Sequence, residues 1–214
     1  MISDLGRAGA DAPAHGFSLP ERDFKGFIFD CDGTLADSMP LHFQAWRAAF
    51  AQHRAPFTFS WELFMRRAGK TLEVTVEELN QEFAASLDPV AVSAAQRASY
   101  AALLPEVGPI VPVLEFLQQI AGKSPVAVAS GGDLPTVRTT LGALGVLELF
   151  PVIVTAADVL RGKPAPDMFL LAAERIAVEP RDCVVFEDSL LGIQAAEAAG
   201  MGAVLVRRLL ADPL

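Results

Sequence analysis

Short apolar runs alternate with longer stretches of helical periodicity along most of the chain. The runs are GFIFD at 26–30, PVAVAS at 125–130, PVIVTA at 151–156, CVVFED at 183–188 and GAVLV at 202–206. They are nearly continuous in hydrophobicity, which is typical of strands covered on both faces. Helical crossovers between parallel strands are expected at about 110–121, 134–144, 166–177 and 189–199. The pattern predicts an α/β fold with a Rossmann-like parallel sheet core flanked by helices.

The stretch from Pro40 to Leu104 breaks this alternation, because it offers helix-like segments and no convincing pair of strands. We therefore expect a small all-helical cap inserted after the first strand. Both connections of such an insert should emerge near the same end of the sheet, so that the cap can close there as a lid. The expected division is an N-terminal arm at 1–24, an α/β core at 25–38 and 105–214, and the cap at 39–104.

Composition and charge narrow the classes of partner. Hydrophobic residues make up 52% of the 214 residues, which is ample for a buried core. The formal net charge of -9 argues against nucleic acid or an anionic membrane as a partner, because both are bound by basic surfaces. No signal peptide and no run as long as a membrane span is evident. We expect a cytoplasmic monomer.

The two cysteines, Cys31 and Cys183, lie in apolar strand-like runs. This usage suggests neither a disulfide framework nor a cysteine-based zinc site, and it fits a reducing compartment. A cysteine phosphatase needs an arginine at the sixth position after its nucleophile, where this chain has Asp37 and Ser189. Cysteine-based phosphate chemistry is therefore not expected.

Polar residues cluster at or shortly after the ends of the apolar runs. In an open parallel sheet, residues just past the carboxyl ends of the strands line one crevice. Clusters that are far apart in the sequence are therefore expected to meet in one site. They are Asp30 with Asp32, Ser130 with Gly131 and Gly132, Lys163, and Glu187 with Asp188.

Two aspartates, Asp30 and Asp32, stand one residue apart and are followed by Gly33, which allows a sharp turn. Like charges placed this close cost free energy unless a positive group neutralises them, which points to a metal or a phosphate site. One carboxylate can attack phosphorus and form an aspartyl-phosphate. Its neighbour Asp32 can protonate the leaving oxygen and then activate water.

The other clusters supply what such chemistry needs. Asp188, helped by Glu187, offers oxygen ligands for a hard cation such as Mg²⁺. Lys163 adds a fixed positive charge, and Ser130 with the amides of the following glycines can hold phosphate oxygens. Taken singly, each cluster is more often a turn, a solvated loop charge or a helix cap. Their occurrence in order at strand ends favours one site, because capping needs no coordination among distant segments.

Four stretches resemble, in order, the motifs of the haloacid dehalogenase-like superfamily of phosphohydrolases: DCDGT, ASGG, GKPAPD and FEDSLLGIQAAEAAG. The likeness covers about residues 25–208. The helical insert resembles the smaller cap of the β-phosphoglucomutase-like branch. Within that branch the chain looks most like bacterial sugar-phosphate phosphatases that act on fructose 1-phosphate and related compounds.

This resemblance implies roles for the residues at the strand ends. Asp30 would be the nucleophile and Asp32 the general acid and base. Ser130 and Lys163 would hold the phosphate, with more of the contact through backbone amides because Gly131 stands where the family often has a polar side chain.

The resemblance also implies a Mg²⁺ site. Its ligands would be Asp30, the backbone carbonyl of Asp32, and Asp188, with Glu187 assisting directly or through water. Ser38 is expected to be a turn or helix-cap residue that hydrogen-bonds Asp32.

The expected cap carries candidate substrate residues, namely His42, Arg66, Arg67 and Lys70. The three basic residues can equally form a solvated helix face. His42 matches a cap-helix histidine of the branch, but a structural histidine packed beside Trp46 is an equal alternative.

These observations predict a magnesium-dependent phosphatase of small phosphorylated metabolites, in particular sugar phosphates. One alternative is a phosphosugar mutase, and another is a non-catalytic protein that binds phosphate or a partner. The mutase branch has a cap signature of Lys, Gly and, three residues later, Arg. This chain has Ala68 before Gly69, and Leu72 where that arginine would fall, which favours hydrolysis.

Overall fold

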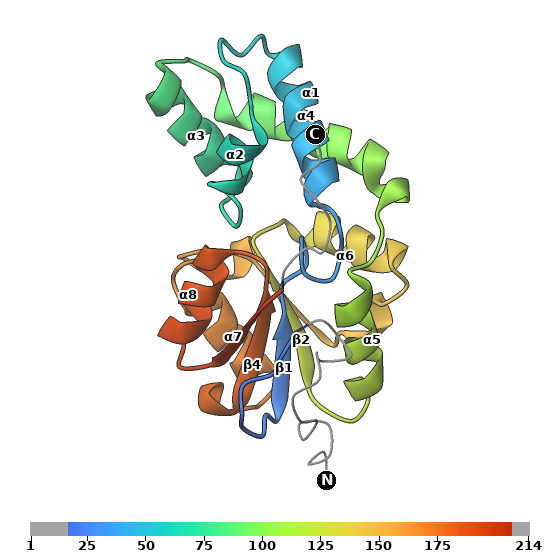
Figure 1. Ribbon diagram of the computed structural model, residues 1–214. Helices are drawn as coiled ribbons and strands as arrows, with labels where there is room; N and C mark the ends of the chain where they lie inside the picture. Colours follow the sequence, from blue (N-terminus) through green and yellow to red (C-terminus); the bar gives the residue numbers. More distant parts are fainter. Residues whose placement is uncertain (1–16, 207–214) are drawn as a thin grey trace.

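The computed structural model describes residues 17–206 and contains one five-stranded sheet flanked by helices (Figure 1). All neighbouring strands are parallel, and their order is β3-β2-β1-β4-β5. The predicted Rossmann-like sheet is therefore confirmed. Residues 1–16 of the predicted arm lie outside the described residues. The strands are β1 Gly26–Phe29, β2 Val126–Ser130, β3 Val152–Thr155, β4 Cys183–Glu187 and β5 Gly202–Leu205.

Helices cover both faces of the sheet, and their bounds are α5 Val111–Ile120, α6 Leu134–Ala143, α7 Asp167–Arg175 and α8 Leu190–Ala198. Alternate side chains of a strand point to opposite faces. Phe27 and Phe29 therefore join the apolar cluster under α5 and α6, whereas Ile28 joins the cluster under α7 and α8. The four crossover helices predicted from the sequence are confirmed, with ends that differ by at most two residues.

The described chain between β1 and α5 forms helices and no extended strand. We use the name cap for residues 39–104, whose boundaries as a domain stay a prediction. The cap has its own apolar cluster, which includes Trp46, Phe50 and Leu79. Figure 1 shows these helices beyond one end of the strands. They are α1 Met39–Gln52, α2 Trp61–Met65, α3 Leu72–Phe83 and α4 Pro89–Leu103.

The two connections between cap and sheet run side by side. The backbone amide of Asp37 donates to the carbonyl of Gly108 at 2.8 Å, and the amide of Ile110 donates to the carbonyl of Leu35 at 2.9 Å. Both connections therefore leave from the carboxyl end of β1, as the sequence predicts. Short 3-10 turns complete the described chain at Leu104–Glu106, Leu147–Leu149, Ala156–Asp158 and Pro180–Asp182.

Among the helices of residues 17–206, none combines the length and the hydrophobicity that a membrane crossing requires.

Candidate active site

The predicted strand-end residues converge on one cavity. Asp30 follows β1, and β1 lies between β2, which ends at Ser130, and β4, which ends at Glu187. Their side chains line a cavity of about 380 Å³ between sheet and cap, together with Asp32 and Asp188. The structure therefore brings three separate segments of the sequence to the same place.

Lys163 lies beneath this cavity, and only 1% of its side chain is exposed. Its Nζ donates to Asp30 Oδ1 at 2.6 Å and to Glu187 Oε1. The second oxygen of Glu187 accepts from the amide and the hydroxyl of Ser189 at 2.7 and 2.8 Å. Burial alone would lower the pKa of Lys163, but the two carboxylates outweigh burial and raise that pKa above its usual value. Lys163 is therefore a fixed positive charge.

Three carboxylates offer oxygen atoms that all lie within 4.8 Å of one another, those of Asp30, Glu187 and Asp188. Burial raises the pKa of Asp30 to about 7, although Lys163 opposes the rise. Burial also raises the pKa of Asp188, and the charges of Asp30 and Glu187 add to the effect. One lysine does not compensate three acids, and within residues 17–206 the Asp188 carboxylate accepts no hydrogen bond. Such an oxygen set fits a hard divalent cation.

Two glycines leave room for these carboxylates. Gly33 has a φ of +83°, and a Cβ there would lie 2.0 Å from Asp188 Oδ2. A Cβ on Gly192, in the first turn of α8, would lie 1.9 Å from the Glu187 carboxyl carbon. Any larger residue at either position would displace an acid of the cluster. Gly33 is predicted from the sequence as a turn residue, whereas the close approach at Gly192 is not.

Asp32 is held by Ser38, which directly precedes the cap, and by His42 of the cap. Its Oδ1 accepts from Ser38 Oγ at 2.6 Å and lies 3.1 Å from His42 Nε2. The other ring nitrogen of His42 lies 3.2 Å from Gln96 Nε2, and the ring stacks on Tyr100 with centroids 3.8 Å apart. Because an amide nitrogen can only donate, this network assigns the histidine proton to Nε2. Burial alone would raise the pKa of Asp32, but His42 and Ser38 outweigh it and lower that pKa.

The hydrogen bond expected between Ser38 and Asp32 is therefore confirmed. His42 packs on Tyr100, whereas Trp46 stacks on Phe50.

The predicted phosphate loop lies directly below a loop of the cap. Ser130 is buried, and its Oγ accepts from the amide of Gly132 at 3.1 Å. A Cβ on Gly131 would lie 3.1 Å from the carbonyl oxygen of Gly69, which belongs to the loop between α2 and α3. The cap is therefore closed over this part of the cavity.

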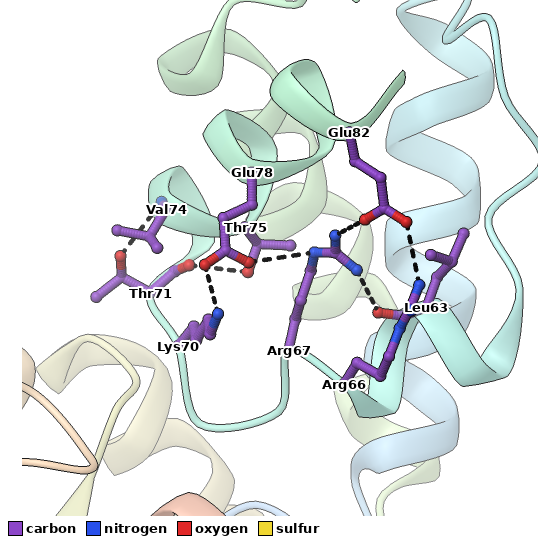
Figure 2. A network of polar contacts seen from close by, with 9 residues as sticks. All are labelled: Leu63, Arg66, Arg67, Lys70, Thr71, Val74, Thr75, Glu78 and Glu82. Atoms are coloured by element: carbon purple, nitrogen blue, oxygen red, sulfur yellow. Dashed lines mark hydrogen bonds and ion pairs between the residues drawn. The ribbon is translucent and has the colours of Figure 1, made fainter. Parts of the chain in front are cut away.

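Three basic residues of the cap are paired with acids of α3 (Figure 2). Arg67 and Lys70 line the cavity, whereas Arg66 does not. Arg66 pairs with Glu82 at 3.1 Å, and Arg67 contacts both Glu78, at 3.4 Å, and Glu82. Lys70 pairs with Glu78. Of the cap residues expected at the site, His42, Arg67 and Lys70 therefore reach it and Arg66 does not.

Sequence reasoning missed three cavity residues on α4, namely Gln96, Arg97 and Tyr100. Arg97 Nη2 lies 2.7 Å from Glu73 in the cap, and its Nε lies 3.2 Å from Asp133, which caps the core helix α6. Helical periodicity marks which residues of α4 share a face, but it does not tell which core residue that face meets.

Comparison with known proteins places the chain in a family. A model described as haloacid dehalogenase-like hydrolase matches residues 24–200. Fructose-1-phosphate phosphatase YqaB from Escherichia coli is 36% identical over 187 residues, which cover 87% of this chain and 98% of that protein. Beta-phosphoglucomutase from Bacillus subtilis is 28% identical over 84% of this chain and 82% of that protein.

A solved structure extends the likeness to three dimensions. A mutant of CbbY from Rhodobacter sphaeroides, in complex with xylulose-(1,5)bisphosphate, has a TM-score of 0.77 and 25% identity, covering 84% of each chain. Sequence and fold therefore agree with the resemblance carried by the four motifs. The chain belongs to the haloacid dehalogenase-like hydrolase family and is a phosphoric monoester hydrolase.

Proposed function

We propose that the protein is a magnesium-dependent phosphatase of small phosphorylated metabolites, in particular sugar phosphates, and that it works through an aspartyl-phosphate on Asp30. The observation that supports this most directly is the buried contact of Lys163 with Asp30 beside the acids Glu187 and Asp188. The cavity of about 380 Å³ suits a small ester. The relative from Escherichia coli, named for fructose 1-phosphate, supports sugar phosphates as the class.

The first step transfers the phosphoryl group to the protein. A carboxylate oxygen of Asp30 attacks phosphorus, and the bond from phosphorus to the alcohol oxygen breaks. Asp32 gives its proton to that leaving oxygen. The low pKa of Asp32 in the free protein does not prevent this role, because an anionic ester bound nearby raises the pKa of a carboxyl group.

The second step releases phosphate. Asp32, now a carboxylate, takes a proton from a water molecule whose oxygen attacks the phosphorus of the aspartyl-phosphate. The bond between phosphorus and Asp30 breaks, so inorganic phosphate leaves and the carboxylate of Asp30 is restored. Hydrogen bonds from Ser38 and His42 keep Asp32 oriented for both proton transfers.

The remaining residues of the site would hold charge. Asp30, Glu187, Asp188 and the backbone carbonyl of Asp32 would bind Mg²⁺, which supplies positive charge that offsets the repulsion between the acids and the phosphate. Lys163 and Ser130, with the amide of Gly131, would hold phosphate oxygens.

Replacement of the proposed nucleophile tests the function. Asp30→Asn should reduce phosphate release from sugar phosphates in Mg²⁺ by at least about 10⁴-fold, because the amide cannot attack phosphorus. The matched control is Asp23→Asn, an exposed aspartate whose replacement should leave turnover unchanged. Retained turnover in a folded Asp30→Asn variant would refute the nucleophile assignment.

A phosphosugar mutase is the second candidate, since the relative from Bacillus subtilis carries that name. A mutase must retain and reorient a bisphosphate, which requires free positive charge in the cap. Here Lys70 is paired with Glu78, and position 72 is a leucine. We expect β-glucose 1-phosphate to yield free phosphate and no glucose 6-phosphate, and isomer formation would favour the mutase.

A further inference from the structure

Three cationic side chains from the cap line the cavity, namely Arg67, Lys70 and Arg97. They belong to the half of the cavity that faces the cap, which we call the cap half, opposite the acids at the strand ends. If the phosphate is bound at the strand ends, this half receives the alcohol part of the ester. The charge of this half therefore decides which alcohols fit.

Each of these three cations is already paired with carboxylates. Arg67 contacts Glu78 and Glu82, and Lys70 contacts Glu78. Figure 2 shows both basic side chains rising from their loop toward α3, away from the core. Arg67 also donates to the carbonyl of Leu63 at 3.0 Å, so its guanidinium is tied to the cap.

Arg97 is paired on two sides, with Glu73 at 2.7 Å and with Asp133 at 3.2 Å. Both acids line the cavity themselves. The three lining cations pair with four carboxylates, those of Glu73, Glu78, Glu82 and Asp133, and Glu82 also pairs with a fourth cation, Arg66, which does not line the cavity. The formal sum of these charges is zero.

We infer that the cap half rejects a second anionic group, so that the substrates are phosphate monoesters of uncharged, hydroxyl-rich alcohols, with Glu78 and Glu82 as specificity-determining residues. This inference rests on the proposed phosphatase function. Glu78 and Glu82 are in direct contact with Arg67 and Lys70, so their negative charge offsets much of the attraction that a carboxylate or a second phosphate would feel on approaching either cation. The loss of hydration of that anion would then have little compensation, which is how a site discriminates against a wrong ligand.

The rest of the lining agrees with an uncharged alcohol. Thr71 and Gln96 offer hydrogen-bonding groups to hydroxyls, and Trp46, Phe64 and Leu72 offer apolar surface to the carbon skeleton.

The test compares two six-carbon monophosphates, of which only one carries a second anionic group. Glucose 6-phosphate has an uncharged end, whereas 6-phosphogluconate has a carboxylate there. For the wild type we expect kcat/KM to favour glucose 6-phosphate by at least about tenfold. Glu78→Gln leaves Lys70 without its carboxylate, so this preference should fall by roughly fivefold, mainly through a lower KM for 6-phosphogluconate.

The matched control is Glu77→Gln, which removes the same charge one residue away at an exposed position of α3. It should leave the preference unchanged. Leu72→Arg provides a second variant that breaks no ion pair, since it adds a cation at the cavity wall, and it should also raise activity toward 6-phosphogluconate.

Equal wild-type rates on the two esters would overturn the inference. An unchanged preference in folded Glu78→Gln and Leu72→Arg would do the same. Failure of the proposed function looks different, because wild-type protein would then release no phosphate from either ester in Mg²⁺.

Discussion

The core and the cap use charge in opposite ways. At the strand ends Asp30, Glu187 and Asp188 are crowded around one buried lysine, so negative charge is in excess. On the cap side, four cations (Arg66, Arg67, Lys70 and Arg97) are matched by four carboxylates, three from α3 and one from Asp133 of the core. A buried excess of negative charge is stable only where a ligand or a cation compensates it. A network of ion pairs with balanced charge contributes little to the free energy of folding when it is partly exposed. We therefore assign the proposed phosphate chemistry to the core and the proposed selection of the alcohol to the cap.

The largest expected effect follows from removing the buried positive charge of the core. Lys163→Met removes the cation that contacts Asp30 and Glu187, which leaves their charges buried without a partner. Breaking a buried pair in this way costs about 3–5 kcal/mol of stability, and turnover should also be lost. Urea unfolding monitored by circular dichroism measures the first effect, and phosphate release measures the second.

Lys25→Met is the control for that experiment, because Lys25 pairs with Asp182 at the surface and its side chain is 73% exposed. An exposed pair is screened by solvent, so this variant should unfold at nearly the wild-type urea concentration. Equal destabilisation by the two substitutions would contradict the difference drawn between buried and exposed charge.

The next largest effect is the stabilisation of the core by Mg²⁺, which would compensate its excess of negative charge. Mg²⁺ at about 100 times its Kd should stabilise the protein by about 2.7 kcal/mol, which is roughly 5–10 °C in Tm for a chain of this size. Asp188→Asn removes one proposed ligand and should abolish most of the shift, whereas Asp23→Asn should keep it. A full shift in Asp188→Asn would show that Mg²⁺ binds elsewhere.

The rise in Tm caused by Mg²⁺ should depend on pH. Without metal, the pKa of Asp30 rises from 3.8 to about 7, so ionisation of Asp30 costs the folded state stability as pH increases through that window. Metal binding requires deprotonated ligands. The rise in Tm caused by Mg²⁺ should therefore be larger at pH 8 than at pH 5, as measured by thermal scans at both values. An equal rise at the two values would contradict this assignment of the ligands.

The core was the more predictable region from sequence. Continuous apolar runs identify buried parallel strands, and the carboxyl ends of such strands share one edge. Asp30, Ser130 and Glu187 could therefore be placed together without coordinates. Lys163 follows no strand directly, and its burial between two acids comes from the path of a loop.

The cap was less predictable, because its contacts join residues that no single periodicity relates. Lys70 and Glu78 belong to a loop and a helix, so helical spacing does not pair them. The five-residue helix α2 is too short to give a clear hydrophobic period, although Ser60 caps it by accepting from the Leu63 amide at 3.1 Å. The pairing of Arg97 with Asp133 depends on how α4 meets the core, which the sequence does not show.

The smallest expected effect follows from removing one positive charge of the cap. Arg97→Ala removes a cation from the cap half of the cavity and leaves the charges of Glu73 and Asp133 uncompensated. Stability should fall by less than about 1 kcal/mol, because the pairs are partly exposed. The preference for glucose 6-phosphate over 6-phosphogluconate should widen about twofold, opposite in direction to Glu78→Gln. Arg138→Ala, at an exposed position of α6, should change neither quantity. A narrower preference in Arg97→Ala would mean that the charge balance of the cap does not select the alcohol.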